Sequence, residues 1–157
     1  MFTRSAHETV IIENISNEDI DSIIQLGTDV PQFDTGTNSL KFFSEETLER
    51  MVKSENCVLL AAKRSGEIIG FIITSINIDT RDAYIHTILV IEQVRNQGIG
   101  GMLLDKTLTK LRETPEKCNH VFGLVHPDNL ASLHLLARLG FDSGTVFKYN
   151  DMMLLSE

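Results

Sequence analysis

The chain has 157 residues, of which 42% are hydrophobic and 23% charged, and this composition is typical of a folded globular protein rather than a disordered segment. At this length we expect one domain over residues 1–157 with a sizeable core. The formal net charge of −8 argues against non-specific nucleic-acid binding, which requires a surplus of cations to neutralise phosphates. It would suit a cationic substrate, although a solvated acidic surface is the commoner reason for such a balance.

The two cysteines, Cys57 and Cys118, lie far apart in the sequence and have no metal-ligand spacing, so we expect reduced thiols and no metal site. The first residues contain only a four-residue apolar run, which is too short for the core of a signal peptide. No segment approaches the ~20 apolar residues of a membrane span. The sequence therefore predicts a cytoplasmic protein that does not contact membranes.

The first half of the chain predicts one strand and two helices. Residues 8–15 form a β-branched run, and the helix that follows has Ser16 or Asn17 as its N-cap and Gly27 as its stop. Residues 30–42 contain proline, glycine and polar turn residues and are expected to form a loop. Ser44 then opens a near capping box, which predicts a short helix.

The second half begins with three strand-like runs within residues 57–91, joined by the turns "RSGE" and "DTRD", so we expect an antiparallel meander. Apolar residues then repeat at helical spacing from Ile99 until Thr114-Pro115 ends the helix. Residues 120–126 predict a strand, 128–140 a helix closed by Gly140, and 145–155 a last strand. This order is that of an α+β domain built around one mostly antiparallel sheet.

Three glycines lie between a strand and a helix in "VRNQGIGGMLL". A dinucleotide fingerprint would need a third glycine at Leu103, and a phosphate-binding P-loop would need a glycine before Lys106-Thr107, so neither motif fits. What remains is the pattern R-x-x-G-x-G over residues 95–100. Glycines there let an anion approach the N–H groups at the helix start, and Arg95 adds a positive charge. A tight turn with an exposed arginine is the alternative.

The glycine turn is followed, after the next strand, by "DNLASLHLLARLGF", which has the form N-x-x-S-L-x-L-L-x-R-L-G-F. Together with "ILVIEQVRNQGIGGMLL", this segment resembles the motifs of the GCN5-related N-acetyltransferase superfamily over about residues 85–141. The resemblance implies a central, twisted, mostly antiparallel sheet of six to seven strands flanked by about four helices. It also implies transfer of an acetyl group from acetyl-CoA to an amine, with no metal.

The resemblance further implies a set of cofactor contacts. Backbone groups of Leu89 and Val90 would pair with the pantetheine arm, and the Leu89 N–H would polarise the thioester carbonyl, an oxyanion-hole role worth ~3 kcal/mol per donor. Asn129 and Ser132 would contact the cofactor from the later helix, with a plain N-cap as the alternative for Asn129. The pyrophosphate would bind the N–H groups of Arg95, Asn96, Gln97, Gly98, Ile99, Gly100 and Gly101.

One position departs from the family pattern. Where family members often have a tyrosine that protonates the leaving thiolate, this chain has Leu136. His134 is two residues away, about 200° around the helix, so it is not on the same face. Solvent, Tyr84 and Tyr149 are the alternatives, and so is a protein that binds acyl-CoA without turnover.

A primary amine with a pKa of ~10.4 is almost wholly protonated at neutral pH, so a general base is expected. Asp82, Tyr84 and His86 alternate along one predicted strand and would share a face. His86 has the most suitable ordinary pKa, and Asp82 matches a glutamate of the histone-acetylating members. His126, at the mouth of the next strand, is a third candidate base, and a polar strand face without any function is the alternative.

The resemblance places the acceptor over the loop at 30–43 and the second predicted helix, where Asp29, Asp34, Glu45 and Glu46 would suit a cationic amine. Cys57 and Cys118 lie outside both motifs, so direct attack in a ternary complex is expected. A nucleotide-binding protein is a third reading, but a ribose-binding acid at the usual spacing is missing. Family members are often homodimers, so a homodimer is a further expectation.

Overall fold

The computed structural model describes residues 8–29, 42–145 and 152. In this part of the chain five strands form one sheet in the order β1-β2-β3-β4-β5, antiparallel except for the parallel pair β4–β5. The strands are β1 (Ile11–Asn14), β2 (Cys57–Arg64), β3 (Glu67–Asn77), β4 (Asp82–Val90) and β5 (His120–Gly123). The meander predicted for 57–91 is confirmed. Of the last predicted strand, residues 145–155, the structure describes only Thr145 and the isolated Met152, so the remainder lies outside the described residues.

Four α-helices and two 3₁₀ turns complete the described chain. They are η1 (Asn17–Asp19), α1 (Ile20–Thr28), α2 (Glu45–Lys53), η3 (Glu92–Val94), α3 (Ile99–Arg112) and α4 (Leu130–Arg138). The α+β class and its mostly antiparallel sheet are confirmed. Among the described helices, none has the length and hydrophobicity to cross a lipid bilayer.

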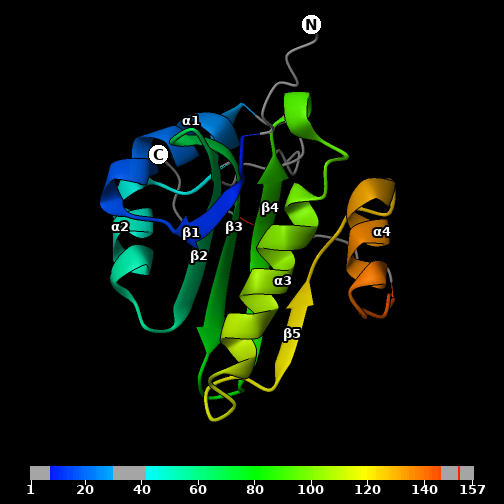
Figure 1. Ribbon diagram of the computed structural model, residues 1–157. Helices are drawn as coiled ribbons and strands as arrows, with labels where there is room; N and C mark the ends of the chain where they lie inside the picture. The colour runs from blue at the N-terminus through cyan, green and yellow to red at the C-terminus, as the bar shows by residue number, and fades with distance from the viewer. Residues whose placement is uncertain (1–7, 30–41, 146–151, 153–157) are drawn as a thin grey trace, which may run out of the picture.

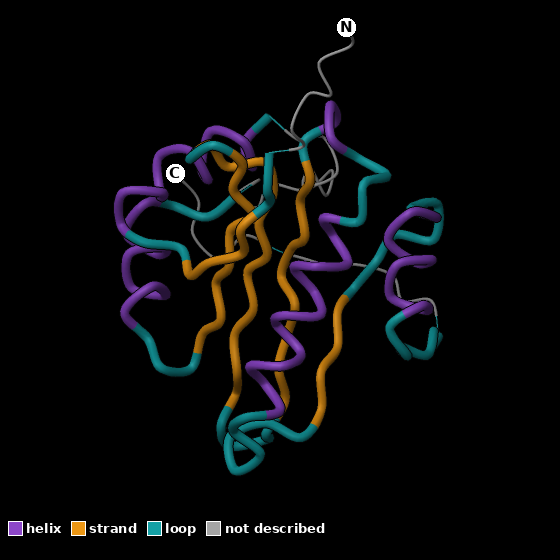
Figure 2. The backbone as a smooth tube through the Cα atoms, viewed as in Figure 1, coloured by secondary structure: helices purple, strands orange, loops and turns teal. Residues whose placement is uncertain are grey.

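The helices cover both faces of the sheet, and the strands alternate their side chains between two cores. Leu59 and Ala61 of β2 pack with α1 and α2, whereas their neighbours Leu60 and Ala62 pack with α3 on the opposite face. Figure 1 shows α3 in front of the sheet and roughly aligned with the strands, α1 and α2 together on the side of β1 and β2, and α4 beyond β5. The tube view in Figure 2 shows the same layers, with strands between the helices.

Strand β4 contains a bulge that reverses this alternation. Ile85 pairs with Thr74 of β3, and Thr87 pairs with the next residue, Ile73, so His86 is an extra residue without a pairing partner on β3. Before the bulge, Ile85 faces the α3 core, and after it Leu89 faces the α1–α2 core. After His86, the side chains of β4 therefore point to the opposite face of the sheet from the one that a regular strand would give them.

Gly27 does not stop the first helix as expected. Helix α1 continues through Thr28, and Gly27 is buried within it. A Cβ atom at Gly27 would come within 2.4 Å of the Phe42 ring, so the glycine allows a close approach of Phe42 to the helix. Phe42 in turn packs edge-on against Phe71 of β3, with ring centroids 5.9 Å apart. A glycine is needed at position 27 because Phe42 packs against it, and this contact between distant residues is not visible in the local sequence.

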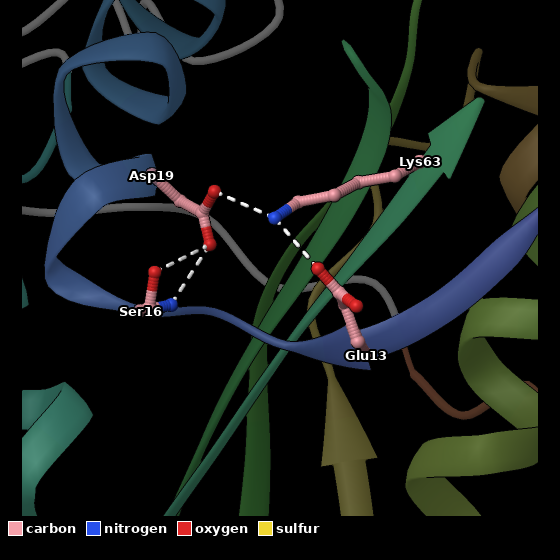
Figure 3. A network of polar contacts seen from close by, with 4 residues as sticks. All are labelled: Glu13, Ser16, Asp19 and Lys63. Atoms are coloured by element: carbon pink, nitrogen blue, oxygen red, sulfur yellow. Dashed lines mark hydrogen bonds and ion pairs between the residues drawn. The ribbon is translucent and has the colours of Figure 1, made fainter. Parts of the chain in front are cut away.

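An ionic network joins the start of the first helix to the edge of the sheet (Figure 3). The Lys63 Nζ lies 2.8 Å from Asp19 Oδ1 and 2.7 Å from Glu13 Oε1. Asp19 Oδ2 accepts hydrogen bonds from the backbone N–H and the hydroxyl of Ser16, which is the capping residue of η1. Burial alone would raise the pKa of the Asp19 carboxyl, but the hydrogen bonds from Lys63 and Ser16 outweigh burial and lower it.

Substituting Asp19→Asn should lower the free energy of unfolding at pH 7 by about 2 kcal/mol, because Lys63 and Ser16 lose the charged partner that buried Asp19 provides. The folded-state pKa of Asp19 is depressed, so its stabilisation is present above the unfolded value of ~3.9 and is lost as the pH falls towards the folded value. Urea denaturation at pH 7 and at pH 3 measures both effects. The exposed Asp21→Asn serves as the control, and an equal loss in both variants would contradict the role of the network.

Candidate active site

Strands β4 and β5 separate beside His86. Their parallel pairing covers four residues of each strand and ends at Ile85 and Gly123. Strand β4 continues to Val90, still paired with β3, whereas the described chain after Gly123 leads through a loop into α4. The side of β4 from His86 to Val90 that faces away from β3 is therefore not covered by β5 (Figure 1).

The backbone of β4 determines which groups face this opening. Ile91 donates its N–H to Ile69 of β3, and in an antiparallel pair this direction alternates from one residue to the next. Leu89 therefore directs its N–H and C=O towards β3, and the groups of Ile88 and Val90 point to the opening. This geometry turns the Leu89 N–H away from the position predicted for it.

The glycine turn joins the end of β4 to α3, and two of its residues have left-handed backbone conformations. Asn96 has φ 62° and Gly98 has φ 82°, and a Cβ at Gly98 would meet no other atom within 4 Å. The first bond of α3 runs from the Met102 N–H to the Gly98 carbonyl, so the N–H groups of Ile99, Gly100 and Gly101 precede the helical ladder. Such a helix start attracts anions.

Two arginines fix the exposed side of this turn. Arg95 donates from Nε to the carbonyl of Val90 at 3.0 Å, which ties the turn back to the end of β4. Arg64, at the end of β2, donates from Nη2 to Oε1 of Gln97 at 3.1 Å. The turn therefore has positive charge on two sides, although the chain as a whole is acidic.

Gly100 has a packing role in addition to the one expected. A Cβ at Gly100 would lie 3.2 Å from Leu135 Cδ2, and one at Gly101 would lie 3.7 Å from Leu135 Cδ1. The two glycines thus let α4 approach the start of α3. Leu136 also packs against the α3 core, so the residue at the position of the usual tyrosine is partly buried among apolar side chains.

The residues predicted on α4 lie at its first turn. Asn129 is the N-cap, and its Oδ1 accepts a hydrogen bond from the N–H of Ser132 at 3.2 Å. This bond occupies the side-chain oxygen of Asn129 and leaves its amide N–H groups as donors. His126 lies in the preceding loop, where its side chain is 76% exposed and its Nδ1 accepts from the Asp128 N–H at 3.2 Å.

His86 is the most enclosed of the three candidate bases. Its Nε2 lies 2.7 Å from the hydroxyl oxygen of Ser75, on the neighbouring strand β3. Its ring also contacts Tyr84 and Phe43, with centroids 4.6 and 5.4 Å away. Burial lowers the pKa of His86, so its ring is neutral at pH 7.

Asp82 shares the strand face of His86, as predicted, but lies at the other end of β4. The two residues are four positions apart along the strand, which corresponds to about 13 Å. The carboxylate of Asp82 lies 2.9 Å from Nδ1 of His120, where β4 and β5 are paired. Hydrogen bonds from Thr80 and His120 lower the pKa of Asp82. The structure does not bring Asp82 to the opening between the strands.

Cys57 lies opposite Ser75 in the pairing of β2 with β3, and both cysteines are free thiols. Burial raises the pKa of the Cys57 thiol, which disfavours the thiolate that a nucleophilic cysteine requires. Among the described residues, no group of three or more His, Cys, Asp and Glu side chains has an arrangement that holds a metal ion.

The family model for the acetyltransferase (GNAT) family matches residues 25–141. The chain belongs to this family. The match includes the glycine turn, the opening beside β4 and all of α4. The resemblance seen in the two motifs is thereby confirmed.

Several solved acetyltransferase structures have the same fold. An aminoglycoside acetyltransferase from an uncultured soil metagenomic sample, in complex with sisomicin, is 19% identical, with a TM-score of 0.70 over 92% of this chain and 97% of the other. The PaiA N-acetyltransferase from Thermoplasma acidophilum, in complex with coenzyme A, is 18% identical, with a TM-score of 0.74 over 88% and 93%.

The ribosomal-protein-S18-alanine N-acetyltransferase from Escherichia coli is 20% identical, with a TM-score of 0.68 over 87% of this chain and 80% of the other. No curated protein sequence matches this chain. At these identities the structures establish a common fold, and their different acceptors belong to those proteins.

Three residues near the site have no signal in the local sequence pattern. Ser75 contacts His86, Arg64 contacts Gln97, and Gly70 of β3 lies against the carbonyl of Leu89. A serine or a glycine within an apolar strand has no distinctive spacing, and each of these contacts joins residues that are far apart in the sequence. Only the pairing of the strands reveals them.

Substituting Gly70→Ala should lower the free energy of unfolding by about 2 kcal/mol, because the new Cβ would lie 2.8 Å from the Leu89 carbonyl oxygen and force the two strands apart. Chemical denaturation measures the loss. Gly144→Ala, where a Cβ would meet nothing within 4 Å, is the control and should change stability little. Unchanged stability of the Gly70 variant would contradict the close approach of β3 to β4.

Proposed function

We propose that this protein is an N-acetyltransferase that moves an acetyl group from acetyl-CoA to an amine by direct attack in a ternary complex. The observation that carries the proposal is the coincidence of two features along β4. The strand separates from β5 at a half-buried, neutral histidine, and it ends in a glycine turn whose helix N-terminus suits an anion. Membership of the acetyltransferase (GNAT) family supports the same reaction.

The residues of the turn and of β4 fit the elongated, anionic cofactor. The Gly98 Cα has open space around it, and the N–H groups of Ile99, Gly100 and Gly101 would bind the pyrophosphate. Arg95, Asn96 and Gln97 complete the turn. The backbone groups of Ile88 and the N–H of Val90, whose carbonyl already accepts from Arg95, would hold the pantetheine arm. One of the two N–H groups takes the thioester role that the sequence predicted for Leu89. Asn129 and Ser132 would border the cofactor from α4.

Acetyl-CoA, when bound, supplies an acetyl thioester that an amine can attack with release of the thiol. His86 is the general base in this proposal, because it lies where β4 and β5 diverge and its ring is neutral at pH 7. It accepts a proton from the acceptor amine. Asp82, held by His120 at the paired end of the strands, and exposed His126 are less suitable.

The proton for the departing thiolate is not supplied by the usual position, because Leu136 has no ionisable group and packs against the α3 core. Tyr84 lies beside His86 on the same strand face and is a candidate for this step. Solvent can also supply the proton, since a thiolate with an ordinary pKa near 8.5 is readily protonated near neutral pH.

A thiol-release assay with acetyl-CoA and a panel of amines tests the proposal: polyamines, aminoglycosides, amino acids and peptides with free N-termini. Turnover with one class would identify the acceptor, and a cationic amine would agree with the net charge of −8. Tight acetyl-CoA binding without turnover on the whole panel would instead favour a non-catalytic acyl-CoA-binding protein, for which Leu136 is the motivating residue. Absence of acetyl-CoA binding would refute both functions.

Substituting Gly98→Glu should abolish CoA binding, because it adds bulk and negative charge at the open side of the turn and forces a side chain into φ 82°. Isothermal titration calorimetry with CoA measures the loss. Gly98→Ala is the matched control for backbone strain and should retain measurable affinity. Wild-type affinity in the glutamate variant would refute the assigned phosphate site.

Substituting His86→Phe should lower kcat/KM at pH 7 by about 10²- to 10⁴-fold, the usual contribution of a general base, while keeping the ring contacts with Tyr84 and Phe43. In the wild type the rate should fall as the pH drops through the lowered pKa of His86, because the protonated ring cannot accept a proton. This acid limb should be absent in the variant. A pH–rate profile of both proteins, at saturating acetyl-CoA, provides the measurement, and an unchanged profile would exclude His86 as the base.

A further inference from the structure

We infer that Ser75 is a positioning residue that sets which nitrogen of His86 accepts the proton. The inference rests on the proposed function, because it concerns the proposed base. Ser75 belongs to β3, whereas His86 belongs to β4, and the Oγ–Nε2 distance of 2.7 Å is that of a well-formed hydrogen bond. Neither motif of the sequence includes Ser75.

The contact lies at the bulge in β4. Ser75 pairs in register with Tyr84, two residues before the unpaired His86, and the imidazole reaches diagonally across to Ser75 on the neighbouring strand. Tyr84 and Phe43 contact the ring at 4.6 and 5.4 Å between centroids, with interplanar angles of 65° and 80°. These contacts restrict the orientation of the imidazole, so one nitrogen is committed to Ser75.

The chemistry of the bond decides the tautomer. A serine hydroxyl can donate to Nε2 or accept from it. If Ser75 donated, the lone pair of Nε2 would be occupied, and Nδ1 would carry the proton. If Nε2–H donates to Ser75 Oγ, Nδ1 has a free lone pair and can take a proton from an amine. The second arrangement also stabilises the cationic ring that results, because its N–H bond to Ser75 becomes stronger.

The other titratable groups near this contact come from three elements. Tyr84 and, further along, Asp82 lie on the same face of β4, and Cys57 of β2 lies opposite Ser75. Arg50 of α2 acts on Cys57 through its charge. Burial raises the pKa of the Cys57 thiol, so this group stays uncharged near pH 7. The hydrogen bond with Ser75 is therefore a contact through which the protonation of His86 can be tuned.

Nitrogen-15 NMR of the imidazole of His86 in the full-length protein tests the inference without any acceptor. His86→Phe identifies the signals by their loss. We expect the Nε2–H tautomer in the wild type and in Ser75→Thr, which keeps a hydroxyl. In Ser75→Ala we expect a mixture of tautomers and a lower pKa for His86. A wild-type ring protonated on Nδ1, or an alanine variant with the wild-type spectrum and pKa, would overturn the inference.

Kinetics of the same variants, measured with the best acceptor of the amine panel, give the second readout. Ser75→Ala should lower kcat about 10-fold with little change in the KM for acetyl-CoA and should move the acid limb of the pH profile to lower pH. Ser75→Thr should restore most of kcat. A loss of kcat that threonine does not restore, or equal activity in all three proteins, would contradict a positioning role. If the wild type turns over no amine, the proposed function fails, and the NMR result still decides the tautomer.

Discussion

The pairing of β4 is the constraint on which the rest of the site depends. On one side, β4 is paired with β3 at every residue except the bulged His86, and on the other side β5 pairs with only four of its residues. A strand within a sheet normally has its backbone polar groups paired on both sides. Because β5 leaves at His86, the groups of Ile88 and Val90 are directed to a side that β5 does not cover. Among the described residues, β4 is thus paired with β3 on one side, while no strand pairs with its other edge beyond Ile85.

The uncovered edge of β4 runs from His86 to the glycine turn, and its two ends pack on opposite faces of the sheet. At the bulge, His86 turns towards Ser75 and the aromatic residues beside α2, so this half-buried histidine lies on the α1–α2 face. At the other end, β4 enters the glycine turn, and α3 packs on the opposite face of the sheet. A cofactor lying along β4 would have its phosphates at the helix start and its reactive end near the histidine. The positive charges agree with the direction proposed for the cofactor, since Arg95 bonds to Val90 and Arg64 to Gln97, both next to the glycine turn.

Residues with short-range signals were predicted well. The three-strand meander, the helix after the glycines and the Asn129 cap were all readable, because turn residues, apolar periodicity and N-caps act within a few positions. Gly27 was misread as a helix stop, since its actual neighbour, Phe42, is 15 residues away. The thioester role was predicted for the Leu89 N–H without regard to the direction of this group. Successive N–H groups of a strand point to alternate sides, and the side on which Leu89 bonds is known only once β3 is known to be its partner.

The sequence by itself determined the order of the elements and the glycine turn, and its two motifs pointed to the acetyltransferase family. These properties depend on residue types at fixed local spacing. The tertiary structure decided which candidate base lies at the opening, which backbone groups of β4 face it, and that Ser75 holds the imidazole. Those features depend on a bulge and on a strand pairing that ends after four residues. Register between strands is set by contacts across the whole sheet, so no local pattern at Asp82, His86 or His126 could separate them.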